Sequence, residues 1–271
     1  MSRVISIFIL LISISSAKAQ WNSSPLGWQA QGLGGIAHPD DIHWAPANQP
    51  AALAKAPHSW YVSILHEQPL MGIAIEQNAF SLAYCRSKQG LGISTSVIRS
   101  AGLYSWRHQL AYGRQLSERW QFGLQWTLLQ WSAPSENWRV SQGNWGVYGI
   151  YSIKDELQLG FGGRFPHRIS QAADEQLSQT QVLECALIWR MGPDGALSTG
   201  FRSGGVAQRP WQIGYEHSVS TKFSVRIGCS GLPLRLATSF AFEWHSLQFQ
   251  FGAEWDPLLL PGLGMEMNHA H

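Results

Sequence analysis

Large apolar residues alternate with polar or small ones along much of this chain, and this alternation restricts its fold more than any other feature. The clearest tract runs from Trp120 to Leu128, where an apolar residue stands at every second position. Successive side chains of a β-strand point to opposite faces, so this tract has one apolar face and one polar face. Such tracts, about ten residues long and separated by turn residues, are typical of transmembrane β-barrels. The pattern therefore predicts an all-β fold, a transmembrane antiparallel β-barrel.

The alternation and the turn residues together predict about fourteen strands. Each predicted strand ends at Gly, Pro, Asn, Asp or other turn-forming residues, which interrupt the alternation. The predicted ranges are 58–67, 78–88, 89–99, 105–114, 120–131, 144–153, 156–165, 180–190, 195–203, 210–219, 222–230, 234–243, 246–255 and 262–271.

The connections between these strands alternate in length, which supports the barrel independently of any single strand. Outer-membrane barrels have short periplasmic turns and longer external loops, so each connection can be given a side. The tight, periplasmic set is 88–89, 116–118, 154–155, 192–194, 220–221 and 244–245. The longer, external set includes 68–77, 132–143, 166–179, 204–209 and 256–261.

The composition fits a membrane wall better than a soluble domain. Charged residues make up only 13% of the chain, and there are 14 tryptophans and 27 glycines. Barrels carry aromatic girdles at both membrane interfaces, whereas soluble domains have about 25% charged residues. A soluble β-sandwich also shows alternation, but it does not need large aromatic residues on its solvent face. The low net charge, with no basic cluster, argues against nucleic acid as a partner.

The amino-terminal part of the chain divides into two expected segments before the barrel at 58–271. Residues 1–19 have a basic Arg3, an apolar run and the sequence Ala17-Lys18-Ala19, which is typical of a secretory signal peptide. Residues 20–57 are rich in Gly, Pro, Asn and Ala and show no alternation. A barrel of fourteen strands is wide enough to need filling, so we expect residues 20–57 to form a short plug-like segment inside it.

The strand faces opposite the apolar one carry charged and amide side chains of both signs. Two interpretations are open: the inward acids and bases pair across the lumen and make the barrel rigid, or they line a polar conduit or ligand site. The predicted lumen-facing polar network is Arg107, Gln125, Arg164, Glu184, Glu216, Arg226, Arg235, Glu243 and Glu254.

Two regions give the chain a resemblance to a known group of barrels. Residues 32–38 (GLGGIAH) and 44–54 (WAPANQPAALA) resemble the "GGA-x-VA … W-x-x-x-NPAGLA" opening of Bacteroidota outer-membrane proteins, and residues 109–125 resemble a hairpin of the same group. These proteins are similar to the PorV group and, more distantly, to the FadL long-chain fatty acid transporters. The resemblance implies a fourteen-stranded barrel with an inward amino-terminal segment, and its plug motif falls on Gly34, Gly35, Asn48 and Pro50. It supplies no catalytic residues.

One short motif invites a catalytic interpretation. The sequence Ala37-His38-Pro39-Asp40-Asp41 reproduces most of the AHPDDE motif of zinc-dependent deacetylases. Those enzymes need a Glu where Ile42 stands and an α/β domain around the motif, and the chain has neither. His38, Asp40, Asp41 and His43 could also form a local metal cluster. We predict no catalytic residue, no metal and no cofactor.

Three functions remain open for an exported protein of the Gram-negative outer membrane, with membrane lipid as a partner. The first, which we favour from the sequence, is a non-enzymatic accessory or docking subunit of a secretion or surface-assembly complex such as type IX secretion, with protein partners. The second is a FadL-like transporter of small hydrophobic or amphiphilic molecules. It predicts an apolar pocket near the plug and an interrupted strand. The third is an outer-membrane enzyme that hydrolyses lipids or esters.

Overall fold

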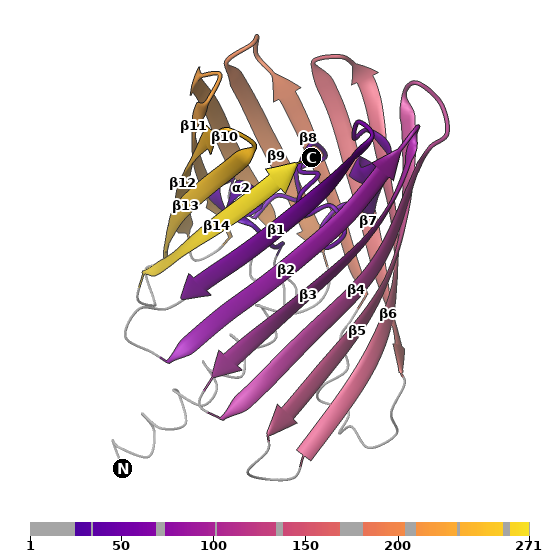
Figure 1. Ribbon diagram of the computed structural model, residues 1–271, viewed down its shortest axis with the longest axis vertical. Coiled ribbons are helices and arrows are strands. Elements are labelled where there is room, and N and C mark those ends of the chain that lie inside the picture. Colours follow the sequence, from indigo (N-terminus) through magenta and orange to yellow (C-terminus); the bar gives the residue numbers. More distant parts are fainter. Residues whose placement is uncertain are drawn as a thin grey trace.

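The chain forms a closed β-barrel in a computed structural model (Figure 1). The structure describes residues 25–33, 35–68, 74–100, 102–133, 138–168, 181–203, 210–231, 234–256 and 261–270. The strands are β1 (Ser59–Gln68), β2 (Ile75–Arg86), β3 (Gln89–Ser100), β4 (Leu103–Gln115), β5 (Trp120–Ala133), β6 (Trp138–Lys154), β7 (Leu157–Arg168), β8 (Val182–Arg190), β9 (Gly195–Ser203), β10 (Trp211–Ser220), β11 (Phe223–Ser230), β12 (Arg235–Trp244), β13 (Leu247–Trp255) and β14 (Gly262–Ala270).

Each strand pairs antiparallel with the next one along the chain, and β14 pairs with β1 to close the barrel. The closing register places Tyr61 opposite Ala270 and Gln68 opposite Leu263. Closure leaves no sheet edge unpaired, which a bilayer requires because it offers backbone groups no water. The predicted fourteen-stranded antiparallel barrel is therefore confirmed.

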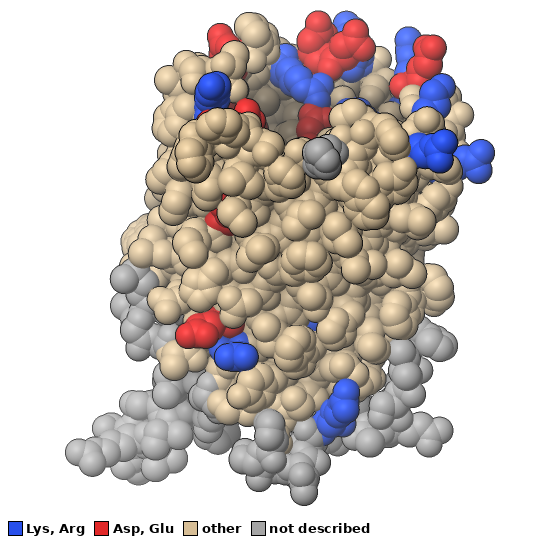
Figure 2. Space-filling view, viewed as in Figure 1, with Lys and Arg blue, Asp and Glu red and all other residues tan. Residues whose placement is uncertain are grey.

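The outer wall carries the large apolar side chains, as the alternation predicts. Along β5, Trp120 and Leu124 are exposed on the outside, whereas Gln121 and Gln125 are buried inside. Neighbouring aromatic rings pack against one another on this wall; the centroids of Trp120 and Tyr151, for example, lie 4.6 Å apart. Figure 2 shows a broad, mostly uncharged belt across the visible face, with many charged side chains above it and a few towards its lower end. This belt matches the lipid-facing band of an outer-membrane barrel.

The tight turns all lie at one end of the barrel, the upper end in Figure 1. They join β2 to β3, β4 to β5, β6 to β7, β8 to β9, β10 to β11 and β12 to β13. The connections at the opposite end contain the ranges 69–73, 134–137, 169–180, 204–209, 232–233 and 257–260, which lie outside the described residues.

Strand boundaries differ from the sequence prediction mainly at β6. This strand begins at Trp138 rather than at 144, because its first residues pair with the end of β5, with Ala133 opposite Trp138. Polar and small residues at 139, 141 and 143 occupy its outer face there, so the apolar alternation is hidden in the sequence. The connection between β5 and β6 is therefore shorter than the predicted loop 132–143. The connection between β1 and β2 is also shorter than the predicted loop 68–77, because β2 begins at Ile75.

The described residues of 25–57 form the lumenal segment, which lies inside the barrel near the tight-turn end (Figure 1). It contains a short helix, α2 (Trp28–Gly32), and a 3-10 turn, η1 (Pro50–Ala54). Helix α2 packs against β11, β12, β13 and β14, whereas η1 packs against β2, β3, β4, β5 and β6. The predicted signal peptide at 1–19 lies outside the described residues. No helix among the described residues is long and apolar enough to cross a membrane.

Candidate functional site: the filled lumen

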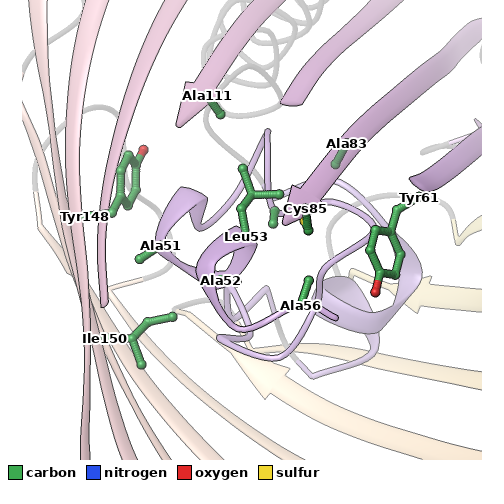
Figure 3. Close-up of a cluster of buried hydrophobic side chains, with 11 residues drawn as sticks. Ala51, Ala52, Leu53, Ala56, Tyr61, Ala83, Cys85, Ala111, Tyr148 and Ile150 are labelled. Atoms are coloured by element: carbon green, nitrogen blue, oxygen red, sulfur yellow. The ribbon is translucent and has the colours of Figure 1, made fainter. Parts of the chain in front are cut away.

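The C-terminal half of the lumenal segment packs into an apolar cluster on the barrel wall. Leu53 of η1 is fully buried and lies between Ala83, Cys85 and Ala111 of the wall (Figure 3). Pro50 begins η1, where its missing N–H leaves no hydrogen bond unmade. The cluster fixes the end of the lumenal segment that leads directly into β1. Its members are Ala45, Ala51, Ala52, Leu53, Ala56, Tyr61, Ala83, Cys85, Ala111, Tyr148 and Ile150.

Glycines on the inner wall let the backbone of the lumenal segment approach the strands closely. A Cβ atom at Gly90 would lie 2.9 Å from the Leu53 Cβ and carbonyl oxygen, and one at Gly214 would lie 2.7 Å from the Leu33 carbonyl oxygen. Cβ atoms at Gly113 and Gly123 would overlap backbone atoms of the turn η1. Glycine is required at these positions by the contents of the lumen.

Amide side chains of the wall bind the backbone of the lumenal segment. Gln125 Nε2 donates to the carbonyl oxygens of Pro46 and Ala47, at 2.7 and 3.1 Å, and Gln109 Nε2 donates to the Ala47 carbonyl at 3.1 Å. Tyr148 donates its hydroxyl to Gln125 Oε1 at 3.1 Å and so orients the amide. These hydrogen bonds satisfy carbonyl groups that no strand or helix satisfies.

The N-terminal half is held on the opposite wall through Trp28. The Trp28 indole is fully buried. The backbone N–H of Trp28 donates to Glu266 Oε2 at 2.7 Å, and its backbone carbonyl accepts from the Ser239 hydroxyl at 3.0 Å. Gln31 Nε2 donates to Glu67 Oε2 at 3.0 Å. Two carboxylates of the β1–β14 seam therefore bind the first helix of the lumenal segment.

The plug-motif positions have different surroundings. Asn48 is buried and links two parts of the lumenal segment, because its side chain accepts from the Leu26 N–H at 2.8 Å and donates to the Leu26 carbonyl at 2.7 Å. Gly35 has a φ of 92°, which favours glycine, and Pro50 opens η1. Gly34 lies outside the described residues.

Asp40 joins the lumenal segment to its own end and to the wall. Its carboxylate forms ion pairs with Lys55 at 2.9 Å and with Arg190 at the end of β8. Burial favours the protonated form of this carboxyl, but His38, Lys55 and Arg190 together lower its pKa to about 2. Asp40 is therefore ionised at neutral pH and has a structural role in this arrangement.

Asp41 is buried in a site that disfavours its charge. Its Oδ1 accepts from the Trp44 N–H at 3.2 Å, whereas its Oδ2 has no hydrogen-bond partner among the described residues. Burial and the nearby Glu266 raise the pKa of Asp41 to about 8, from an ordinary value of 3.8. Asp41 therefore carries a proton at neutral pH when the lumenal segment is docked.

The pKa of Asp41 makes docking depend on pH. A free segment loses this proton near pH 3.8, whereas the docked segment keeps it up to about pH 8. Docking therefore weakens as the pH rises from about 4 to 8 and is constant above that range. Burial lowers the pKa of His38, and it lowers that of His43 to about 4, so both histidines weaken docking only as the pH falls below 6.5. Between pH 6.5 and 8, Asp41 dominates.

Among the described residues, the inward ion pairs between barrel strands join neighbouring strands. This corrects the expectation that acids and bases pair across the lumen. Glu216 lies directly opposite Arg226 in the sheet register, and their side chains meet at 2.8 Å. The lumenal segment occupies the space between opposite walls, so the nearest partners are those along the wall. The other pairs of this kind are Arg202–Glu184 at 3.1 Å, Arg164–Glu184 at 3.8 Å and Arg235–Glu254 at 3.8 Å.

Among the other predicted lumen residues, Arg107 and Gln125 are buried, but Glu243 is exposed at the tight-turn rim. The prediction did not single out Glu67, Gln109, Arg202 or Glu266, which bind the lumenal segment or pair along the wall. Their positions in the alternation could have assigned them to the inner face. Glu266, for example, stands between Met265 and Met267, which both point outward.

A small pocket with a volume of about 20 Å³ lies between the middle of the lumenal segment and β7–β10. Ile36, Ala37 and Ala186 give it an apolar side, and Glu184 and Arg202 give it a charged one. Gln49 and Gln212 also line it, and each has one buried amide atom without a hydrogen-bond partner among the described residues. This volume holds about one water molecule and lies far below the usual range for small-molecule sites, roughly 300–1,000 Å³.

Comparison with known proteins identifies solved structures that share this fold. No family model and no curated protein matches the chain. Among solved structures it is similar to the CymD monoaromatic hydrocarbon channel (TM-score 0.70, 10% identity, 90% of this chain and 96% of that chain covered). It is also similar to the Pseudomonas putida toluene transporter TodX (0.66, 10%, 91% and 97%) and to a Pseudomonas aeruginosa FadL homologue (0.58, 9%, 92% and 98%).

The chain therefore has the fold of FadL-like outer-membrane barrels, the more distant group of the resemblance seen in the sequence. The first two structures are of a hydrocarbon channel and a toluene transporter. None of the three names the PorV group, a secretion system or the Bacteroidota, so that part of the resemblance stays a prediction.

Proposed function

We propose that the chain is a FadL-like outer-membrane transporter of small hydrophobic or amphiphilic molecules. The observation that carries the proposal is a barrel of this fold whose lumen holds its own amino-terminal segment, with a part-apolar pocket between segment and wall. The similarity to hydrocarbon channels supports transport better than the role of a secretion subunit. No contact of the described residues favours a protein partner.

The route runs along the lumen. A route through the wall would need an interrupted strand. β3 pairs with β2 and β4 at every position from Gln89 to Ser100, and the register shifts among the described pairings, at Ser152/Lys154 and Ser218/Ser220, lie beside the tight turns. The pocket is too small to form a continuous path past the lumenal segment. Passage therefore requires part of the lumenal segment to move.

The part that moves is the middle of the lumenal segment, residues 36–43. His38 Nε2, Asp41 Oδ2 and His43 Nδ1 are buried without hydrogen-bond partners among the described residues. Each such atom costs about 1–3 kcal/mol, and together they offset the ion pair that joins Asp40 to Arg190 of the wall. Residues 46–54, in contrast, are held by Gln109 and Gln125 and by the apolar cluster around Leu53.

Uptake of an apolar fluorescent probe by cells with an intact lipopolysaccharide layer tests the proposal. N-phenylnaphthylamine becomes fluorescent when it reaches the membrane interior, and the outer leaflet slows its entry. Cells that make the protein should take up the probe faster than cells that lack it, while entry of a hydrophilic β-lactam should stay the same. Equal probe uptake in both strains would refute transport of this class of molecule. Faster entry of both compounds would indicate a general leak instead.

A further inference from the structure

The outer wall at the tight-turn end carries a row of basic side chains on neighbouring strands. Arg86 of β2 lies directly opposite Gln89 of β3, and Gln89 lies directly opposite Arg114 of β4. Paired residues share a face, and Cys85 and Gly113 beside them are buried, so this row points outward. Lys88 is exposed in the turn between β2 and β3.

The spacing of the row suits a single phosphate group. Strands lie about 4.8 Å apart, so the Cα atoms of Arg86 and Arg114 are about 10 Å apart with Gln89 between them. Two arginine side chains can converge across that gap on one phosphate, which accepts paired hydrogen bonds from guanidinium groups. Among the described residues, Arg86, Lys88 and Arg114 take part in no ion pair. The acidic residue of the adjacent turn, Glu118, is followed directly by Arg119.

Below this row the wall changes from basic to aromatic and then to apolar. The next row is Tyr84, Leu91 and Tyr112, and the one after it is Leu82, Ile93 and Leu110. Tyr112 donates its hydroxyl to Gln89 Oε1 at 3.4 Å, so the aromatic row contacts the polar one. Leu91, Ile93 and Leu110 are about half exposed. The sequence of rows matches the order of headgroup, interface and acyl chains in a lipid leaflet.

We propose that Arg86, Lys88, Gln89 and Arg114 form a binding site for the headgroup of an anionic glycerophospholipid in the periplasmic leaflet. The tight turns place this end in the periplasm, where the leaflet consists of glycerophospholipid. The two arginines and Lys88 bind the phosphate and the remaining negative charge, Gln89 donates its amide, and the acyl chains lie along Leu91 and Ile93. Figure 2 shows basic side chains at this upper rim, directly above the uncharged belt. The site does not depend on what passes through the lumen.

Native mass spectrometry of the full chain released from vesicles of phosphatidylcholine with 5% phosphatidylglycerol tests the site. Wild type should retain phosphatidylglycerol. The double variant Arg86→Gln/Arg114→Gln should retain it at least about 100-fold less, because each removed guanidinium ends a charge-assisted hydrogen bond to the phosphate that contributes at least about tenfold. The matched control is Arg119→Gln/Lys154→Gln, which removes the same charge from other tight turns of the same rim. The control should retain the lipid within about twofold of wild type.

Two results would overturn the site. Equal losses in both double variants would show that the whole rim attracts anionic lipid without a local site, and unchanged retention in Arg86→Gln/Arg114→Gln would show that these arginines bind no lipid. Unheated migration on a denaturing gel, compared with the boiled sample, verifies that each variant is folded. The substituted side chains are exposed, so we expect both barrels to form.

Discussion

Gly252→Ala should release the N-terminal half of the lumenal segment while leaving the barrel intact. The three atoms nearest to a Cβ at position 252 all belong to the Trp28 indole and would overlap it. The ring is fully buried, so it has no free space in which to move and must leave its site. Loss of a buried Trp side chain costs about 3–5 kcal/mol. The backbone pairs of Gly252 with Ser239 and Gly264 do not involve its side chain, so the sheet should keep its register.

Hydrogen exchange of amides in residues 25–33 measures this release. A loss of about 3–5 kcal/mol predicts exchange faster by roughly 100- to 3,000-fold, since each 1.4 kcal/mol is a factor of ten. Gly160→Ala is the matched control, because a Cβ there would lie 3.2 Å from the flexible Gln49 amide and at an ordinary contact distance of 3.9 Å from the Ala186 carbonyl oxygen. Unchanged exchange in Gly252→Ala, or the same acceleration in Gly160→Ala, would refute the view that the inner glycines make room for the segment.

Two further variants test how the lumenal segment is held. Gln125→Leu removes the hydrogen bond to the Pro46 carbonyl and should weaken docking of residues 44–54 by about 1–3 kcal/mol. The control is Gln121→Leu, which should change docking by less than about 1 kcal/mol, because Gln121 Oε1 is buried without a partner among the described residues. Amide exchange of residues 47–54 compares the two variants, and equal effects would contradict this role for Gln125. Asp41→Asn should abolish the weakening of docking between pH 6.5 and 8. The measurement is the amide hydrogen exchange of residues 36–43, corrected for the intrinsic exchange rates. A wild type whose docking does not weaken over this pH range would contradict the buried, protonated Asp41.

The fold was predictable because a bilayer imposes period-two alternation on every strand. Trp120 and Gln121 show it within two residues, and the closed barrel follows from repeating it. The start of β6 escaped prediction because Arg139 and Ser141 stand on its outer face, near the end of the wall. The contacts of the lumenal segment were not predictable either. A glycine such as Gly252 reads alike in a sequence whether it relieves strand curvature or admits an indole ring, and only the packing distinguishes the two.

A reversible lock on the lumenal segment tests the central claim, that hydrophobic molecules pass only when its middle moves. A Cβ at Gly200 would lie 3.3 Å from Ile36 Cγ1, so Ile36→Cys/Gly200→Cys places two thiols within reach of a disulfide. The pair is introduced into a chain whose three native cysteines are replaced by alanine, with Ile36→Cys alone as the control. Oxidation should reduce N-phenylnaphthylamine uptake to that of cells without the protein, and reductant should restore it. Equal uptake with the disulfide closed and open would contradict the claim.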